Sequence, residues 1–267
     1  MRRPEPILSI HNPRVKLWAQ LLDKKGRDKQ GLYLVEGIHL VQEALIYNAG
    51  VEALLYSEER GIPAEIESYV QADTKLECVP VSEQVLAKCS DAQTPQPVIA
   101  IVRKSSRSAE TLLDIPNGLV VVADGLQDPG NLGTIIRSAD AVGASGVVLG
   151  QGTVDLYNPK TVRSTMGSLF HVAVAEADLL PLIAKAKSHG IRLVNTSLQA
   201  KRTCYEADFT GATWLVLGNE GKGVSPEVAA QIDEHVIIPM KGQAESLNVA
   251  MAATVLLFEA MRQRGSN

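Results

Sequence analysis

The regular alternation of short apolar runs with helical patterns constrains the fold of this chain more than any other feature. Residues 119–123 (LVVVA) precede a helical pattern, and residues 214–217 (WLVL) precede a glycine-rich turn. Strands that are apolar at nearly every position are typical of sheets covered on both faces, which favours parallel strands. Repeated β/α alternation therefore predicts an α/β fold.

The chain divides into two domains. Residues 103–110 (RKSSRSAE) are polar and aperiodic, which indicates a boundary. We expect a small α/β sandwich domain over residues 1–103, a linker over 104–116 and a parallel-sheet α/β domain over 117–267. The expected strands are 32–35, 51–56, 76–81, 98–102, 119–123, 147–149, 172–175, 191–195, 214–217 and 236–238. The expected helices are 13–25, 38–47, 64–70, 83–88, 132–142, 159–167, 179–188, 225–231 and 246–262.

The composition argues against a membrane or secreted protein. The chain has 267 residues, of which 45% are hydrophobic and 21% charged, and it lacks an apolar run of membrane-spanning length. Its first residues lack the apolar core of a signal peptide, and its three scattered cysteines form no C-x-x-C pattern. We therefore expect a cytoplasmic protein with reduced thiols, no metal site and no membrane partner.

The first thirty residues are basic, although the whole chain has a formal net charge of −4. They contain eight Lys and Arg residues but only three acids. Such a segment fits an RNA contact or a solvated helix face equally well. The candidate RNA contacts are Arg14, Lys16, Lys24, Lys25 and Arg27, and Arg2, Arg3 and Lys29 complete the basic set.

A second basic segment lies at the predicted start of the helix 159–167. Asn158, Lys160, Arg163 and Ser164 fall within two turns of this helix. Basic and hydroxyl side chains at a helix start suit an RNA phosphate backbone. An ordinary exposed helix start has the same pattern and stays open as the alternative.

The glycine-rich turns fit no nucleotide-binding fingerprint. The turn after residue 123 offers only Gly130-x-x-Gly133, where a dinucleotide site needs G-x-G-x-x-G. The turn GNEGKGVS (218–225) lacks G-x-x-x-x-G-K-[ST], because glycine follows Lys222. A nucleoside triphosphatase is therefore disfavoured.

Polar residues stand at the ends of the predicted elements, namely Asn131, Arg137, Glu220, Ser246 and Asn248. From spacing alone, Asn131 and Ser246 are explained as helix N-caps, and Glu220 as a solvated turn acid. Arg137 would also be solvated, because it falls off the apolar stripe of its helix. Capping explains Asn248 less well, since asparagine is a poor helix former.

Three blocks taken together resemble the SpoU (TrmH-like) family of RNA ribose 2′-O-methyltransferases. The blocks are NLGTIIRSA (131–139), LVLGNEGKGV (215–224) and IPMKGQAESLNVAMAA (238–253), in the family's order. The resemblance covers about residues 117–265. The first hundred residues are similar to the family's substrate-binding extension, which has a ribosomal-protein-like α/β fold.

This resemblance implies a C-terminal deep trefoil knot and a homodimer formed through the C-terminal domain. A second subunit would account for the final helix, which is apolar almost all round between Val249 and Met261. S-adenosylmethionine is expected to bind in the knot. Its expected contacts are the backbone around Leu217, Gly218, Ile238, Met240 and Leu247.

The family's catalytic positions match the polar residues Asn131, Arg137, Glu220, Ser246 and Asn248. The resemblance implies methyl transfer to a ribose 2′-hydroxyl, with ribosomal RNA as the expected substrate. A guanidinium is essentially never deprotonated, so Arg137 is expected to hold phosphate and stabilise a developing alkoxide. Two alternatives stay open, namely a tRNA ribose methyltransferase and a non-catalytic RNA- or ribosome-binding protein that keeps the knot.

Overall fold

The computed structural model describes residues 5–265, so Arg2 and Arg3 lie outside the described residues. The chain forms two compact units. The first contains the residues up to Ser105 together with Asp155–Phe170, and the second contains Ser106–Val154 and the chain from His171 onward. The segment Asp155–Phe170 therefore belongs to the first unit, although it lies in the second half of the sequence.

The first unit has a four-stranded sheet in the order β1-β4-β2-β3. β4 is antiparallel to β1 and β2, whereas β2 and β3 are parallel. The strands are β1 (Leu32–Glu36), β2 (Val51–Ser57), β3 (Glu77–Val81) and β4 (Val98–Arg103). The helices are α1 (Pro13–Ala19), α2 (Lys24–Gln30), α3 (Ile38–Ile46), α4 (Ala64–Ala72), α5 (Glu83–Lys88) and α7 (Pro159–Thr165), with 3-10 helices at Gln20–Leu22 and Ser168–Phe170.

The helix predicted over residues 13–25 is wrong, because the structure breaks it. α1 is followed by a 3-10 helix, and Asp23 is extended (φ −98°, ψ 142°) before α2 begins. The break brings Gly26 against Gln20, where a Cβ would lie 1.9 Å from the carbonyl oxygen. This contact joins two backbones, so the periodicity of apolar side chains does not reveal it.

The second unit is built on a seven-stranded sheet in the order β7-β6-β5-β10-β8-β11-β9. Every pairing within it is parallel, which confirms the predicted parallel sheet. The strands are β5 (Leu119–Asp124), β6 (Gly146–Leu149), β7 (Val174–Glu176), β8 (Arg192–Thr196), β9 (Arg202–Thr203), β10 (Thr213–Gly218) and β11 (Glu234–Ile237). The helices are α6 (Pro129–Ala141), α8 (Leu179–Ser188), α9 (Pro226–Ala229) and α10 (Val249–Arg264), with a 3-10 helix at Ala109–Leu112. β9 was not predicted, because two residues show no periodicity.

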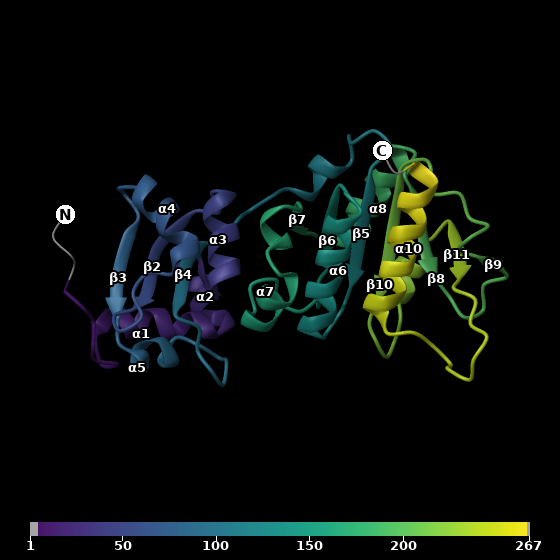
Figure 1. Cartoon of the computed structure of the whole chain (residues 1–267). Coiled ribbons are helices and arrows are strands. Elements are labelled where there is room, and N and C mark those ends of the chain that lie inside the picture. Colours follow the sequence, from purple (N-terminus) through teal and green to yellow (C-terminus); the bar gives the residue numbers. More distant parts are fainter. Residues whose placement is uncertain (1–4, 266–267) are drawn as a thin grey trace. The chain divides into compact units, whose positions relative to one another are not determined.

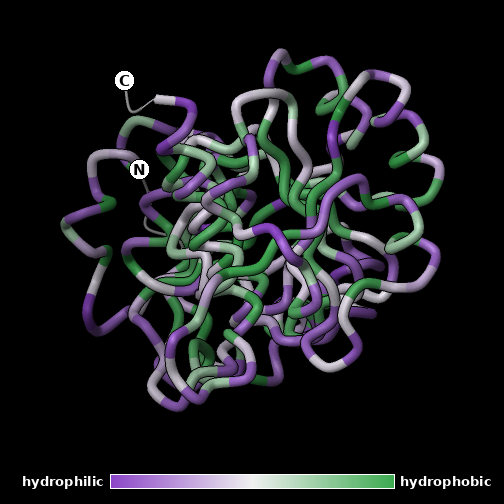
Figure 2. Tube along the Cα trace, turned by 90° about the vertical axis from the view of Figure 1, so that its right-hand side faces the viewer, coloured by the Kyte–Doolittle hydropathy of each residue, from purple (hydrophilic) through white to green (hydrophobic). Residues whose placement is uncertain are grey.

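Helices cover both faces of this sheet, as wholly apolar strands require. Trp214 and Val216 of β10 share a buried cluster with Leu182 and Ile183 of α8. α10 contacts both α6 and β10, and it lies in front of β10 in Figure 1. In Figure 2, hydrophobic stretches alternate along the trace with hydrophilic ones. Among residues 5–265, no helix combines the length and apolar character that a membrane span requires.

The parallel strands bring the predicted site residues to one edge of the sheet. Gly218, the last residue of β10, is in register with Asp124, the last residue of β5. The turn to α6 follows β5, and the turn that contains Glu220 follows β10. The carboxyl edge of a parallel sheet is where α/β proteins usually bind ligands.

Candidate active site

Glu220 is the centre of a hydrogen-bond network at this edge. Its Oε1 accepts from the backbone N of Asp128 at 3.0 Å, and its Oε2 accepts from the backbone N of Gln127 at 3.0 Å. Oε1 also accepts from Nδ2 of Asn131 at 3.0 Å. These donors are neutral, so hydrogen-bond direction rather than charge pairing orients the carboxylate.

Asn131 connects Glu220 to Asn248. Asn131 and Asn248 are 117 residues apart in the sequence. Nδ2 of Asn248 donates to Oδ1 of Asn131 at 3.0 Å. Asn131 therefore uses its amide nitrogen toward Glu220 and its oxygen toward Asn248. The three side chains form one continuous chain of hydrogen bonds between α6, the turn after β10 and the start of α10.

The helix caps differ from those predicted at this edge. The N-cap of α6 is Asp128, whose Oδ1 accepts from the backbone N of Asn131 at 2.8 Å. The N-cap of α10 is Asn248, and its Oδ1 accepts from the N–H groups of Ala250 and Met251. Both predicted caps are therefore wrong. Because Asp128 caps α6, the Asn131 side chain is available to the network. The capping of α10 accounts for the asparagine at position 248.

The pKa of Glu220 is lowered from its ordinary value of 4.5. Partial burial raises this pKa, but hydrogen bonds from the Asn131 side chain and from the amides of Asp128 and Gln127 outweigh that effect. Hydrogen bonds to the charged form of a carboxyl group stabilise its anion. Glu220 is therefore ionised at neutral pH and acts as a hydrogen-bond acceptor.

The loop that contains Glu220 is closed by the residues that flank it. A Cβ on Gly218 would lie 2.1 Å from the backbone of Gly223, so no other side chain fits there. Oδ1 of Asn219 accepts from two backbone amides of the loop at 3.0 Å each. Nδ2 of Asn219 donates to the carbonyl oxygen of Gly125 at 2.9 Å, which ties the loop to the turn after β5.

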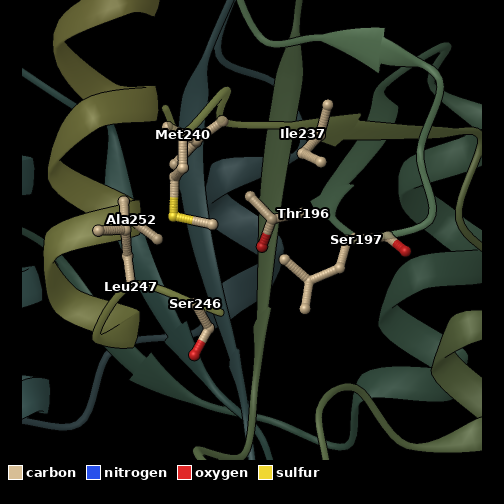
Figure 3. Close-up of a pocket in the computed structure, with 9 residues that line it drawn as sticks. Thr196, Ser197, Ile237, Met240, Ser246, Leu247 and Ala252 are labelled. Atoms are coloured by element: carbon tan, nitrogen blue, oxygen red, sulfur yellow. The ribbon is translucent and has the colours of Figure 1, made fainter. Parts of the chain in front are cut away.

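A pocket of about 130 Å³ lies between the end of β8 and α10. Its lining includes three of the predicted cofactor-binding residues, Ile238, Met240 and Leu247. Figure 3 shows the side chain of Met240 extending into the space between α10 and Thr196 of β8. An apolar lining with a few hydroxyl groups is typical of small-molecule sites.

The other predicted residues differ in their relation to this pocket and to the network. Ser246 lines the pocket, whereas Leu217 and Gly218 end β10 and are not among its described lining residues. Arg137 is exposed on α6, and no hydrogen bond or ion pair within residues 5–265 holds its guanidinium. The structure thus joins Asn131, Glu220 and Asn248 directly, but it does not join Arg137 to them.

Arg27 is not available for the predicted RNA contact. Its side chain is only 2% exposed, and its Nε and Nη2 donate to Oδ2 of Asp155 at 2.9 and 2.5 Å. Its Nη1 donates to the carbonyl oxygens of Leu21 and Leu22. The prediction for Arg27 is therefore wrong, because a local count of charges cannot reveal an acid that is 128 residues away.

The remaining predicted RNA contacts differ in how free their side chains are. Lys16, Lys24 and Lys25 are exposed. Arg14 pairs with Glu77 at 2.6 Å, and Arg163 pairs with Asp91. The side chains of Asn158 and Ser164 bind the backbone of Lys160, at its N–H and its carbonyl oxygen respectively.

Sequence reasoning missed the backbone groups that hold Glu220, which belong to Gln127 and Asp128. Every residue except proline has an N–H, so no residue-type signal marks these donors. It also missed Thr196 and Ser197, which line the pocket. A signal for these two was present, because they follow the carboxyl end of a predicted strand.

Comparisons with known proteins identify the family of this chain. Residues 118–258 match the model of the SpoU rRNA Methylase family, which is more than half of the chain. The chain belongs to the SpoU rRNA methylase family. Residues 12–100 match the MRM3-like substrate binding domain. In this SpoU chain, the network and the pocket lie entirely within the methylase match.

Relatives of this SpoU chain align over almost its full length. It is 38% identical over 252 residues to the 23S rRNA (guanosine(2553)-2′-O)-methyltransferase RlmP of Bacillus subtilis (strain 168), covering 94% of this chain and 97% of the relative. It is 32% identical over 265 residues to the 23S rRNA (uridine(2479)-2′-O)-methyltransferase of Streptomyces viridochromogenes, covering 96% and 92%. The crystal structure of the SpoU methyltransferase AviRb from S. viridochromogenes in complex with the cofactor AdoMet superposes with a TM-score of 0.87 at 32% identity, covering 95% of this chain and 98% of that one.

Proposed function

We propose that this SpoU chain transfers the methyl group of S-adenosylmethionine to a ribose 2′-hydroxyl of 23S ribosomal RNA. The observation that supports this best is the hydrogen-bonded chain Glu220–Asn131–Asn248, which joins three separate sequence blocks. Ribosomal RNA is favoured over tRNA because relatives aligned over nearly their full length are named 23S rRNA 2′-O-methyltransferases. The reaction would take place in the cytoplasm, with the ribosomal RNA.

The pocket beside α10 has the chemistry that an adenosyl group requires. Ile238, Met240 and Leu247 give it apolar walls, and Ser246 adds a hydroxyl group. Its described lining contains no lysine or arginine, which suits a neutral nucleoside better than a phosphate. When bound, S-adenosylmethionine supplies an electrophilic methyl group on its sulfonium sulfur.

Arg137 is the residue that we assign to the reacting ribose. A ribose hydroxyl is a weak nucleophile, so the enzyme must position it and stabilise the charge that develops on its oxygen. A guanidinium combines a positive charge with several N–H donors, so that of Arg137 would hold the adjacent phosphate and stabilise that oxygen. Its exposure, with no acid bound to it in the described part of the chain, leaves it free to meet RNA.

Asn131 and Asn248 would orient the ribose. Each side-chain NH₂ group has two hydrogens, and the network uses one from each residue. The second hydrogen of each can donate to an oxygen of the sugar. Glu220 holds Asn131 in the orientation that makes this possible, which is a role for an ionised carboxylate that is not itself the base.

The proposal includes a homodimer formed through α10, and the C-terminal trefoil knot expected for the family. Met251 and Phe258 are 52% and 44% exposed on α10, and their spacing puts both on one face of the helix. Large apolar side chains grouped in this way suit a second copy of the chain. The first unit would bind RNA through exposed lysines, with Lys16, Lys24 and Lys25 the best placed.

The test is a methylation assay followed by alkaline hydrolysis. Purified protein is incubated with labelled S-adenosylmethionine and, in separate reactions, with 23S rRNA or tRNA from cells that lack this gene. Ribose methylation leaves a labelled dinucleotide that resists alkali, whereas base methylation leaves only labelled mononucleotides. Label found in tRNA instead would support the tRNA alternative, and RNA binding without labelling would support the non-catalytic one.

A further inference from the structure

The turn that donates two amides to Glu220 is held from its other side by the loop after β6, residues 150–154. Both the backbone and the side chain of Gln127 take part in these contacts. Its backbone N donates to Glu220, while its side-chain Nε2 donates to the carbonyl oxygen of Gly152 at 2.5 Å and to that of Gly125 at 3.1 Å. An exposed glutamine in solvent needs no such contacts, so this side chain links the turn to the loop.

Thr153 makes the matching contacts from the loop. Its Oγ1 donates to the carbonyl oxygen of Ala123 at 3.1 Å and accepts from the backbone N of Gly125 at 3.2 Å. The next residue, Val154, donates its N–H to the carbonyl oxygen of Leu126 at 2.8 Å. The Thr153 hydroxyl thus donates its hydrogen to the end of β5, at Ala123, and accepts a hydrogen bond from the turn, at Gly125.

Both ends of this loop are fixed. At its start, the backbone N of Gly150 donates to the carbonyl oxygen of Ala123 at 2.8 Å. A Cβ on Gly150 would lie 2.5 Å from Leu179, so this residue cannot move toward α8. At its end, the backbone N of Val154 is held by the carbonyl oxygen of Leu126. The turn therefore rests on a loop that cannot shift freely.

We propose that Gln127 and Thr153 are positioning residues for methyl transfer, because they hold the turn 125–128 where its amides meet Glu220. Glu220 in turn orients Asn131 and, through it, Asn248. This inference rests on the proposed function, since it assigns those groups to the reacting ribose. In this role neither Gln127 nor Thr153 needs to contact the substrate.

The matched test compares Thr153→Val with Thr153→Ser, and adds Gln127→Met. Valine keeps the shape of threonine and removes the hydroxyl, whereas serine keeps the hydroxyl. We expect kcat for 23S rRNA methylation to fall about tenfold in Thr153→Val and Gln127→Met, because a misplacement of about 1 Å can cost about 10²-fold and losing one of several contacts on the turn should displace the orienting groups by less. The KM for RNA and the Kd for S-adenosylmethionine should be unchanged, and Thr153→Ser should restore most of the rate.

The pKa of Glu220 gives a readout that a role in folding alone would not move. Fewer or longer amide hydrogen bonds raise this pKa, so the acid limb of the pH profile should shift to higher pH in Thr153→Val but not in Thr153→Ser. The charged side chains on the surrounding segments are Asp124 just before the turn, Asp128 at its end, Lys222 in the Glu220 loop and Arg137 on α6. All of them are retained in every variant.

The same pKa can be measured without turnover, by carbon-13 NMR of the labelled Glu220 carboxyl group in the wild type, Thr153→Val and Thr153→Ser. If the wild type gives no alkali-resistant product, the proposed function fails, and the NMR comparison still tests the positioning. Equal kcat values and an equal Glu220 pKa in Thr153→Val and Thr153→Ser would overturn the inference. So would a loss confined to thermal stability.

Discussion

Two carboxylates in this chain are held in opposite ways. Asp155 in the first unit is bound by the buried guanidinium of Arg27, and their side chains are only 10% and 2% exposed. Glu220 in the second unit is exposed at the edge of the sheet and is held by neutral amides. The first arrangement is saturated and closed to ligands. The second uses one hydrogen of the Asn131 amide and one of the Asn248 amide.

The buried ion pair stabilises the fold, whereas the exposed hydrogen bonds orient side chains. A buried ion pair whose partner is removed leaves an uncompensated charge, so its loss reduces stability. A carboxylate bound by directed hydrogen bonds at a surface contributes little to stability, but it fixes the direction in which Asn131 and Asn248 point. Mutations in the first region should therefore unfold the protein, and mutations in the second should inactivate a folded one.

Arg27→Met should have the largest effect on stability. It leaves the Asp155 carboxylate without its partner in a buried site, which should lower the free energy of unfolding by about 3–5 kcal/mol. Chemical denaturation measures this change. The matched control is Arg14→Met, which breaks the exposed pair with Glu77 and should cost at most about 1 kcal/mol. Equal losses of unfolding free energy in Arg27→Met and Arg14→Met would contradict the structural role of the buried pair.

Arg137→Ala should have the largest effect on catalysis. Losing a group that stabilises developing charge should lower kcat by about 10³-fold, because single donors to an oxyanion have effects of this order. The Kd for S-adenosylmethionine, measured by calorimetry, and the free energy of unfolding should be unchanged. Arg107→Ala, at an exposed arginine in the polar segment that precedes β5, is the control. Near-normal turnover by Arg137→Ala would remove the assignment.

Glu220→Gln tests whether the network serves activity rather than stability. The new amide nitrogen would face N–H donors, so the hold on Asn131 should weaken. We expect kcat to fall about 10²-fold. The free energy of unfolding should change far less than in Arg27→Met. Glu227→Gln, at an exposed acid on α9, controls for the loss of one negative charge. A folding defect as large as that of Arg27→Met would contradict the assignment.

The pH dependence of the unfolding free energy gives a further test of the role of Glu220. The pKa of Glu220 lies below its ordinary value of 4.5, so the stabilisation linked to its ionisation is fully present above that value. It is lost as the pH falls through the lower folded-state value. The difference in unfolding free energy between wild type and Glu220→Gln should therefore stay constant from neutral pH down to about 4.5 and shrink below it. A difference that changes near neutral pH would show that another group is responsible.

The smallest effect is expected from Lys24→Gln with Lys25→Gln, on the same helix as Arg27. These exposed lysines should contribute charge to RNA binding, so the double variant should bind 23S rRNA several-fold more weakly. Removing two phosphate contacts should also flatten the slope of log affinity against log salt by about two. Filter binding at several salt concentrations measures both quantities. If the RNA affinity and its salt dependence are unchanged, RNA binds to another surface of the protein.

Much of the fold could be predicted from the sequence, because its strands are apolar at nearly every position. That pattern led to the parallel sheet of the second unit, which the strand pairings confirm. The break between α1 and α2 could not be predicted, since it depends on the approach of Gly26 to the Gln20 backbone. The antiparallel pairings of β4 were also hidden, because strand direction depends on how the strands are connected in space.

The candidate site could be located from the sequence, but the hydrogen bonds that join its residues could not. Polar residues at element ends pointed to Asn131, Glu220 and Asn248, and the family resemblance supplied their chemistry. Their mutual hydrogen bonds depend on where two helices begin, and both starts differ from those predicted. Charge counting grouped Arg27 with Lys24 and Lys25, although one is buried and two are exposed. Local sequence reports the charge of a residue and not its partner.

The membership of Asp155–Phe170 in the first unit has a consequence for how this protein can be dissected or recombined. A fragment that stops at residue 103 lacks the acceptor of Arg27 and also lacks Tyr157, whose ring lies 4.5 Å from that of Tyr33. Such a fragment would expose an orphaned cation and part of its own interior. A chimaera that borrows the first unit must therefore take two separate stretches of the gene, and gene shuffling that moves only one of them should give insoluble products.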